Sequence, residues 1–161
     1  MKRKIVLLLT VIIISSFVLA SCGTSAKDVA LNDLFSAVDN VVAEKENLSE
    51  VSLDTLKSFY SEIDSSLVSE YKAMRTTSGT KVDQYGVFIC NDDASAKSFA
   101  GQLENGIKTI AASAANFGYT PEEQPKLDSA KVVTSGKYVI YAILSDTERE
   151  AAVTAFNSLV K

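Results

Sequence analysis

The segment that most restricts the fold is Lys131–Leu144. Two runs rich in β-branched and aromatic residues, 131–134 and 137–144, flank the dipeptide Ser135-Gly136. Such runs predict a β-hairpin, because glycine adopts the positive φ that tight hairpin turns need. Alternation along the second run predicts two faces, with Tyr138, Ile140 and Ala142 on one and Val139, Tyr141 and Ile143 on the other. The chain is therefore expected to contain an antiparallel sheet.

The rest of the chain supplies further helices and strands. Apolar residues recur at helical spacing in four segments, each expected to be a helix: 31–42, 53–60, 99–117 and 152–160. Two more segments have strand patterns, a half-exposed strand at 67–74 and an inner strand, apolar on both faces, at 85–90. The sequence therefore predicts one α+β domain, an antiparallel sheet of about four strands with helices packed mainly on one face.

Several residues are expected to mark the ends of these helices. The pair Asp92-Asp93 can cap the long helix at its start, and Gly118 can end it. Ser145 and Glu148 have the spacing of a capping box at the start of the last helix.

Two glycines interrupt the long helix. Gly101 and Gly106 each weaken a helix by up to about 1 kcal/mol relative to alanine. They also permit a neighbouring element to approach the helix closely.

The N-terminus has the pattern of a secretory signal. Lys2, Arg3 and Lys4 precede residues 5–20, which carry no charge and are mostly aliphatic. This run is shorter than the roughly 20 apolar residues of a stable membrane-spanning helix. An ordinary secretory signal or a short anchor would share these features, so the residues that end the run decide between the alternatives.

The run ends in Leu19-Ala20-Ser21-Cys22, which resembles the lipobox of bacterial lipoproteins. The resemblance implies that a peptidase recognises Leu19, Ala20 and Ser21 and cuts before Cys22, whose thiol carries a diacylglycerol group. Two acyl chains suffice for stable attachment to a bilayer. We expect residues 1–21 to be a lipoprotein signal peptide, residues 22–27 a lipidated tether, and residues 28–161 a single extracytoplasmic domain at the cell membrane.

The charge balance excludes one class of partner. Residues 1–21 hold three of the 16 Lys and Arg and none of the 20 Asp and Glu, so the rest of the chain has a formal net charge of −7. An acidic body is repelled by phosphate backbones, so we expect no nucleic-acid partner. The expected partners are the lipid bilayer, through the diacylglycerol on Cys22, and an envelope protein or a small ligand.

The residue types argue against catalysis. The chain has no histidine, which is the commonest general base and metal ligand. Of its two cysteines, Cys22 is expected to carry lipid, and Cys90 lies in an apolar strand where burial would raise its pKa. The run Asn91-Asp92-Asp93 lacks the spaced ligands of a calcium loop. We therefore expect no enzyme activity, no catalytic residue, no metal and no cofactor.

One segment stands out as a candidate binding surface. Residues 117–127 hold both prolines of the chain, an aromatic residue and two adjacent carboxylates. Prolines restrict a loop, and such loops often present binding groups, here Tyr119, Glu122 and Glu123. The alternative is a crossover loop that Tyr119 pins to the sheet. Adjacent carboxylates point apart in most backbones, so Glu122 and Glu123 are not expected to share acid–base work.

A family resemblance covers roughly residues 60–160 and the signal. It rests on Tyr119-Thr120-Pro121-Glu122-Glu123, on Leu127, Ala130 and Val132, and on Gly136-Lys137-Tyr138-Val139. These residues resemble the C-terminal half of a family of small Gram-positive lipoproteins known as a domain of unknown function. The resemblance implies an extracytoplasmic location on the cell membrane and supplies no activity, ligand or catalytic residue.

Three functions remain open from the sequence. The first is a membrane-anchored lipoprotein with a binding or accessory role in the cell envelope. The alternatives are a carboxylate-dependent envelope hydrolase and a small solute-binding component of a transporter. A hydrolase should bring two carboxyl groups together across a cleft, whereas a binding module needs only an exposed patch or groove.

Overall fold

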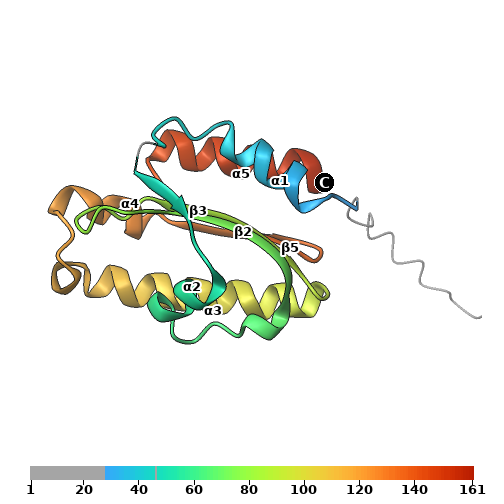
Figure 1. The fold of residues 1–161 in the computed structure, drawn as a ribbon, viewed down its shortest axis with the longest axis horizontal. Coiled ribbons are helices and arrows are strands. Elements are labelled where there is room, and N and C mark those ends of the chain that lie inside the picture. The colour runs from blue at the N-terminus through green and yellow to red at the C-terminus, as the bar shows by residue number, and fades with distance from the viewer. Residues whose placement is uncertain (1–27, 46) are drawn as a thin grey trace, which may run out of the picture.

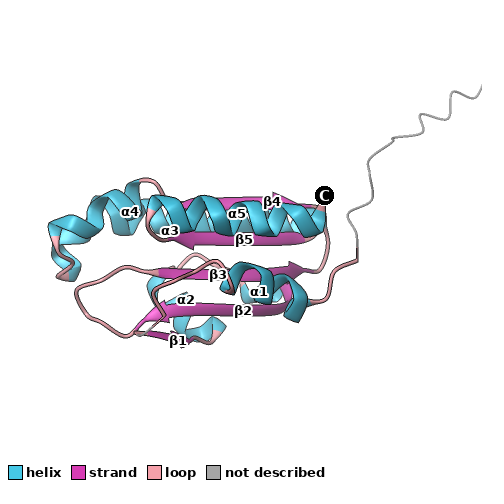
Figure 2. Cartoon of the chain, turned by 90° about the horizontal axis from the view of Figure 1, so that it is seen from above, coloured by secondary structure: helices cyan, strands magenta, loops and turns pink. Residues whose placement is uncertain are grey.

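The computed structural model of the protein describes residues 28–45 and 47–161. In this part of the chain, five strands form one antiparallel sheet in the order β1-β2-β3-β5-β4 (Figure 2). The strands are β1 (Leu48–Glu50), β2 (Val68–Thr76), β3 (Gln84–Cys90), β4 (Lys131–Ser135) and β5 (Tyr138–Ile143). The α-helices are α1 (Leu31–Asp39), α2 (Leu53–Phe59), α3 (Asp93–Ala112), α4 (Gln124–Asp128) and α5 (Asp146–Val160). The predicted α+β class and antiparallel sheet are confirmed.

The structure differs from the expectation in two details of the sheet. Within the described residues it has five strands rather than about four, because the short β1 extends it beyond β2. Helices also cover both faces: α1 and α5 lie on one and α2 and α3 on the other (Figure 1). The physical reason lies in β3 and β5, whose residues are buried on both sides of the sheet and need a cover on each.

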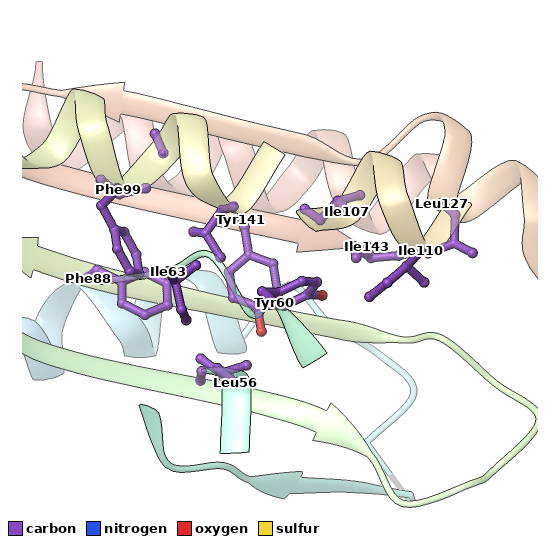
Figure 3. Packing of buried hydrophobic residues seen from close by; sticks show 14 of the residues in the cluster. Leu56, Tyr60, Ile63, Phe88, Phe99, Ile107, Ile110, Leu127, Tyr141 and Ile143 are labelled. Atoms are coloured by element: carbon purple, nitrogen blue, oxygen red, sulfur yellow. The ribbon is translucent and has the colours of Figure 1, made fainter. Parts of the chain in front are cut away.

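Two separate hydrophobic cores follow from this layering. The core under α2 and α3 contains Val139, Tyr141 and Ile143, and the core under α1 and α5 contains Tyr138, Ile140 and Ala142. The predicted division of β5 into two faces is therefore confirmed. Figure 3 shows part of the first core, where the ring of Tyr60, which directly follows α2, meets aromatic rings from β3, α3 and β5.

The first core contains two tyrosines that each pack on a glycine. A Cβ on Gly106 would lie 2.8 Å from Cδ1 of Tyr60, and one on Gly86 would lie 2.8 Å from Cε1 of Tyr141. The two rings contact each other edge to face, with centroids 6.4 Å apart (Figure 3). Gly106 thus permits the predicted close approach, whereas a Cβ on Gly101 would meet nothing within 4 Å.

The predicted hairpin forms, with its turn one residue further along. Ser135 pairs with Tyr138, so the turn residues are Gly136 and Lys137 rather than Ser135 and Gly136. Gly136 has φ +55° and is the first central residue of the turn. This is the position at which a type II′ turn requires glycine, which explains the register.

The helix ends agree with the sequence in part. Asp92 caps α3 by accepting a hydrogen bond from the Ser95 N–H at 2.7 Å, as predicted. The helix ends at Ala112, earlier than expected, and a 3-10 turn continues to Gly118, which has φ +78°.

The predicted capping box at the start of α5 does not form. The Ser145 hydroxyl donates to the Glu148 carboxylate at 2.6 Å instead of accepting from the helix backbone. One oxygen of the Glu148 carboxylate accepts this bond from Ser145, and the other accepts from the backbone of a different segment, the loop after α1. The carboxylate therefore does not turn back to the Ser145 N–H, as a capping box requires.

The elements run between two ends of the domain (Figure 2). At the first, here named the Asp28 end, Lys137 binds Asp28 at 3.1 Å and the Ser135 hydroxyl donates to the Val160 carbonyl at 3.3 Å. At the second, the Tyr119 end, the loop after β2 meets residues 119–126 through the Thr120 N–H, which donates to the Thr80 carbonyl at 3.2 Å. No helix in the described ranges is both long and apolar enough to span a membrane. The predicted signal peptide and tether lie outside those ranges.

Candidate functional site

Tyr119 lies where the 3-10 turn after α3 ends. Its ring stacks on Phe117, with centroids 6.0 Å apart and an interplanar angle of 21°. Its hydroxyl accepts a hydrogen bond from Arg75 of β2 at 3.3 Å. Tyr119 therefore ties its segment to the sheet, as the alternative reading of this segment predicted. Phe117 is left 49% exposed, more than any other large hydrophobic residue in the described ranges.

Arg75 connects Tyr119 to the rest of this end. Its guanidinium lies 3.8 Å from the centroid of the Phe59 ring, at the end of α2. A cation over an aromatic ring is attracted by the ring quadrupole, so Phe59 orients Arg75 toward Tyr119. The Nε of Arg75 is buried and makes no hydrogen bond in the structure.

Glu123 has a structural role at this end. Its side chain is buried, and its carboxylate accepts from the Val82 N–H at 3.0 Å and from Lys126 at 3.1 Å. Lys126 also binds Asp83 at 2.8 Å. Burial acts to lower the pKa of Lys126, but the hydrogen bonds to the two carboxylates outweigh it and raise that pKa above its usual value. This network fastens the loop after β2 to the start of α4.

Glu122 points away from this network. Its side chain is exposed, and hydrogen bonds from its own backbone N–H and the Thr120 hydroxyl lower its pKa. The predicted binding residues are thus only partly brought together: Tyr119 and Glu122 lie at the surface of the same end, and Glu123 is occupied internally. The two carboxylates have different surroundings, Glu123 buried among its own partners and Glu122 exposed, in keeping with the expectation that they do not share acid–base work.

A surface depression of about 700 Å³ lies beside the network. Asp83 lines the depression and also binds Lys126 in the network. The described residues that line the depression are Ala43, Glu44, Lys45, Asn47, Leu48, Thr76, Lys81 and Asp83. Its charged groups are two lysines and two carboxylates, which suits a polar ligand of mixed charge better than a strongly anionic one.

The wall of this depression is held by Glu148 of α5. Its carboxylate accepts from the backbone N–H of Ala43 at 2.9 Å and of Glu44 at 3.3 Å. Burial raises the pKa of Glu148, but the hydrogen bond from Ser145 and these backbone hydrogen bonds outweigh it and lower that pKa overall. Lys45 is fixed in turn by an ion pair with Asp39 at 2.6 Å.

Sequence reasoning missed the depression because its residues come from separate segments. The hydrogen bonds that shape it join residues 41 and 105 positions apart in the chain, Val82 with Glu123 and Ala43 with Glu148. No local pattern signals such a pair.

The Cys90 thiol has the properties of an unreactive, buried side chain. Its side chain is 1% exposed, and burial together with the nearby Asp92 carboxylate raises its pKa to about 11. A thiol with that pKa is almost entirely protonated near neutral pH and is a poor nucleophile. The predicted direction of the pKa change is confirmed.

The described residues contain no cluster of three or more metal-ligating side chains. The candidate lipid-attachment residue Cys22 and the recognition residues Leu19, Ala20 and Ser21 lie outside the described ranges. At the Tyr119 end, the geometry offers a polar depression and an exposed aromatic pair, both features of a binding surface.

Comparison with known proteins gives one match. No curated protein and no solved structure matches the chain. Residues 41–144 match the family described as "Domain of unknown function (DUF4358)". The matched span runs from the loop after α1 to the end of β5, so it contains the whole sheet, the Tyr119 end and well over half of the chain. The chain therefore belongs to the DUF4358 family.

Proposed function

We propose that the protein is a lipoprotein anchored at the outer face of the cell membrane of a Gram-positive bacterium, with a binding or accessory role in the envelope. In this proposal diacylglycerol on Cys22 holds the protein on the membrane, and the Tyr119 end binds an envelope protein or a small polar ligand.

A single observation carries the anchoring. Three basic residues, an uncharged run and Leu19-Ala20-Ser21-Cys22 follow one another in the order of a lipoprotein signal. Lipid on Cys22 would supply two acyl chains, which gives stable attachment without a basic surface. The formal net charge of −7 that remains after residue 21 accords with this, because an acidic domain gains nothing from anionic headgroups.

Two features of the Tyr119 end support binding over catalysis. The exposed Phe117, stacked on Tyr119, and the polar depression both lie at this end of the domain. The adjacent carboxylates point apart, and Glu123 is held by Val82 and Lys126. A carboxylate hydrolase needs two carboxyl groups about 5–10 Å apart across the scissile bond.

The anchoring is tested by replacing the acylated thiol. We expect Cys22→Ala to abolish incorporation of labelled palmitate and to delay or block cleavage before residue 22. The matched control is Cys90→Ala, which removes the other cysteine and should leave labelling, cleavage and membrane fractionation unchanged. Labelling and fractionation of Cys22→Ala that equal those of the wild type would refute the anchoring.

The absence of catalysis is tested by turnover assays on cell-wall glycans and peptides, with Glu122→Gln and Glu123→Gln beside the wild type. We expect no turnover from any of the three. Turnover by the wild type that either substitution abolishes would establish the hydrolase alternative instead.

A further inference from the structure

The chain enters the domain at a fixed point. Asp28 binds Lys137 at 3.1 Å, and the Val29 N–H donates to the Tyr138 hydroxyl at 2.8 Å. Both partners belong to the β4–β5 hairpin. The segment that leads to residue 28 must therefore leave the domain at the Asp28 end.

The Tyr119 end is separated from the Asp28 end by about the length of helix α3. α3 starts beside the Asp28 end, where the Cys90 N–H donates to the Lys137 carbonyl at 2.8 Å, and its 20 residues run toward the Tyr119 end (Figure 1). At 1.5 Å per residue the helix is about 30 Å long. Phe117 and Tyr119 follow the C-terminal end of this helix, so they lie about a helix length from the Asp28 end.

The tether is shorter than that distance. Six residue steps separate Cys22 from Asp28. A fully extended chain spans at most about 3.6 Å per residue, so the reach is at most about 22 Å. With Cys22 held at the lipid surface, this length excludes an upright domain that rests its Tyr119 end on the membrane and holds its Asp28 end about 30 Å above it.

We propose that the Asp28 end faces the lipid headgroups and that the Tyr119 end points away from the membrane. The partner of the Tyr119 end is then a component of the envelope beyond the bilayer surface, and not a lipid. This inference rests on the proposed lipidation of Cys22. Four acidic side chains, Asp28, Glu70, Asp92 and Asp93, outnumber the basic Lys137 and Lys161 near the Asp28 end, so charge attraction to anionic lipid does not set the orientation and the tether does.

The orientation can be measured by energy transfer, because the chain has no tryptophan and each introduced one is a unique donor. Ser158→Trp places the donor on the exposed side of the last turn of α5, at the Asp28 end. Phe117→Trp places it at the Tyr119 end. The lipidated proteins, purified from membranes, are reconstituted in phosphatidylcholine vesicles that contain dansyl-labelled phosphatidylethanolamine. We expect several-fold more efficient transfer from Ser158→Trp than from Phe117→Trp.

Thr134→Trp, on the exposed side of β4, replaces Ser158→Trp if that variant does not fold by circular dichroism. The matched control inserts ten Gly and Ser residues between Lys27 and Asp28, which adds about 33–36 Å of reach and should reduce the difference in transfer. Equal or reversed transfer in a protein whose lipid is verified by mass spectrometry would overturn the orientation and leave the lipoprotein proposal intact. A difference that persists after the insertion would overturn the role of the tether. Absence of lipid on Cys22 would overturn both proposals.

Discussion

Gly106 and Gly101 lie in the same helix, α3, yet they have different surroundings. Replacing glycine by alanine inside a helix stabilises it by up to about 1 kcal/mol. At Gly106 the new Cβ would lie 2.8 Å from the Tyr60 ring, which is fully buried and held between α3 and β5. We expect Gly106→Ala to lower the free energy of unfolding by about 1–3 kcal/mol, the usual cost of overpacking.

Gly101→Ala is the control for this prediction, because its Cβ would meet nothing within 4 Å. We expect it to raise the free energy of unfolding by about 0.5–1 kcal/mol. Urea unfolding followed by circular dichroism measures both values. Equal effects of the two substitutions would mean that Tyr60 yields to the new methyl group.

Among the described residues, Glu148 is the side chain of α5 that hydrogen-bonds to the backbone of the loop after α1. Glu148→Gln removes the charge that its backbone donors stabilise, so we expect a loss of about 1 kcal/mol at pH 7, allowing for partial solvent exposure. The pKa of Glu148 in the folded state lies below the usual pKa of a glutamate side chain, so the charged form stabilises the folded state above that usual pKa. As the pH falls through the lowered pKa, this contribution is lost.

The wild type and Glu148→Gln should therefore differ in unfolding midpoint at pH 7, and the difference should shrink at pH 3. Unfolding by urea at the two pH values measures the difference. A gap of the same size at both pH values would show that the carboxylate charge does not hold the loop.

The β4–β5 hairpin depends on one backbone conformation. Gly136 has φ +55°, which β-branched residues rarely adopt. We expect Gly136→Val to lower the free energy of unfolding by about 1 kcal/mol or more. Gly79, in the loop after β2, needs no positive φ and has no atom within 4 Å of its Cβ position, so Gly79→Val should change stability by less than about 0.5 kcal/mol. Thermal unfolding compares the two, and similar losses would contradict the role of the Gly136 φ.

The helices and strands show which parts of the fold a local sequence pattern can predict. β5 and α3 were predictable because apolar residues recur at a regular spacing along each of them. The capping role of Asp92 was predictable because a cap depends only on residues close in the sequence. β1 has three residues, too few to show alternation, so the sheet was expected to be one strand smaller. Of the candidate site, only the surface position of Tyr119 was predictable. The Glu123 carboxylate instead accepts a hydrogen bond from the Val82 N–H, a long-range contact that no spacing in the sequence indicates.

The two cores of the molecule share one sheet, which should make unfolding a single transition. Ile140 and Ile143 are fully buried on opposite faces of β5, one in each core. We expect Ile140→Val and Ile143→Val each to lower the stability of the whole domain by about 0.5–1.5 kcal/mol. Far-UV and near-UV circular dichroism should follow the same urea curve for both variants. Separate curves, or a variant that shifts only one of them, would indicate that the cores unfold independently.

The place of β4 at the sheet edge, combined with the entry of the chain at the Asp28 end, limits how two copies could meet. Antiparallel pairing of β4 with β4 of a second copy turns that copy end over end about a twofold axis. Its Asp28 end would then be displaced away from the bilayer by about the length of the paired strand, which is five residues or about 17 Å. That displacement takes up most of the tether's reach of about 22 Å, so copies anchored in the same membrane could join their sheets this way only with the tether of one copy almost fully extended. Attachment to the membrane would thus disfavour pairing of a strand that, in a free domain, is open to edge-to-edge aggregation.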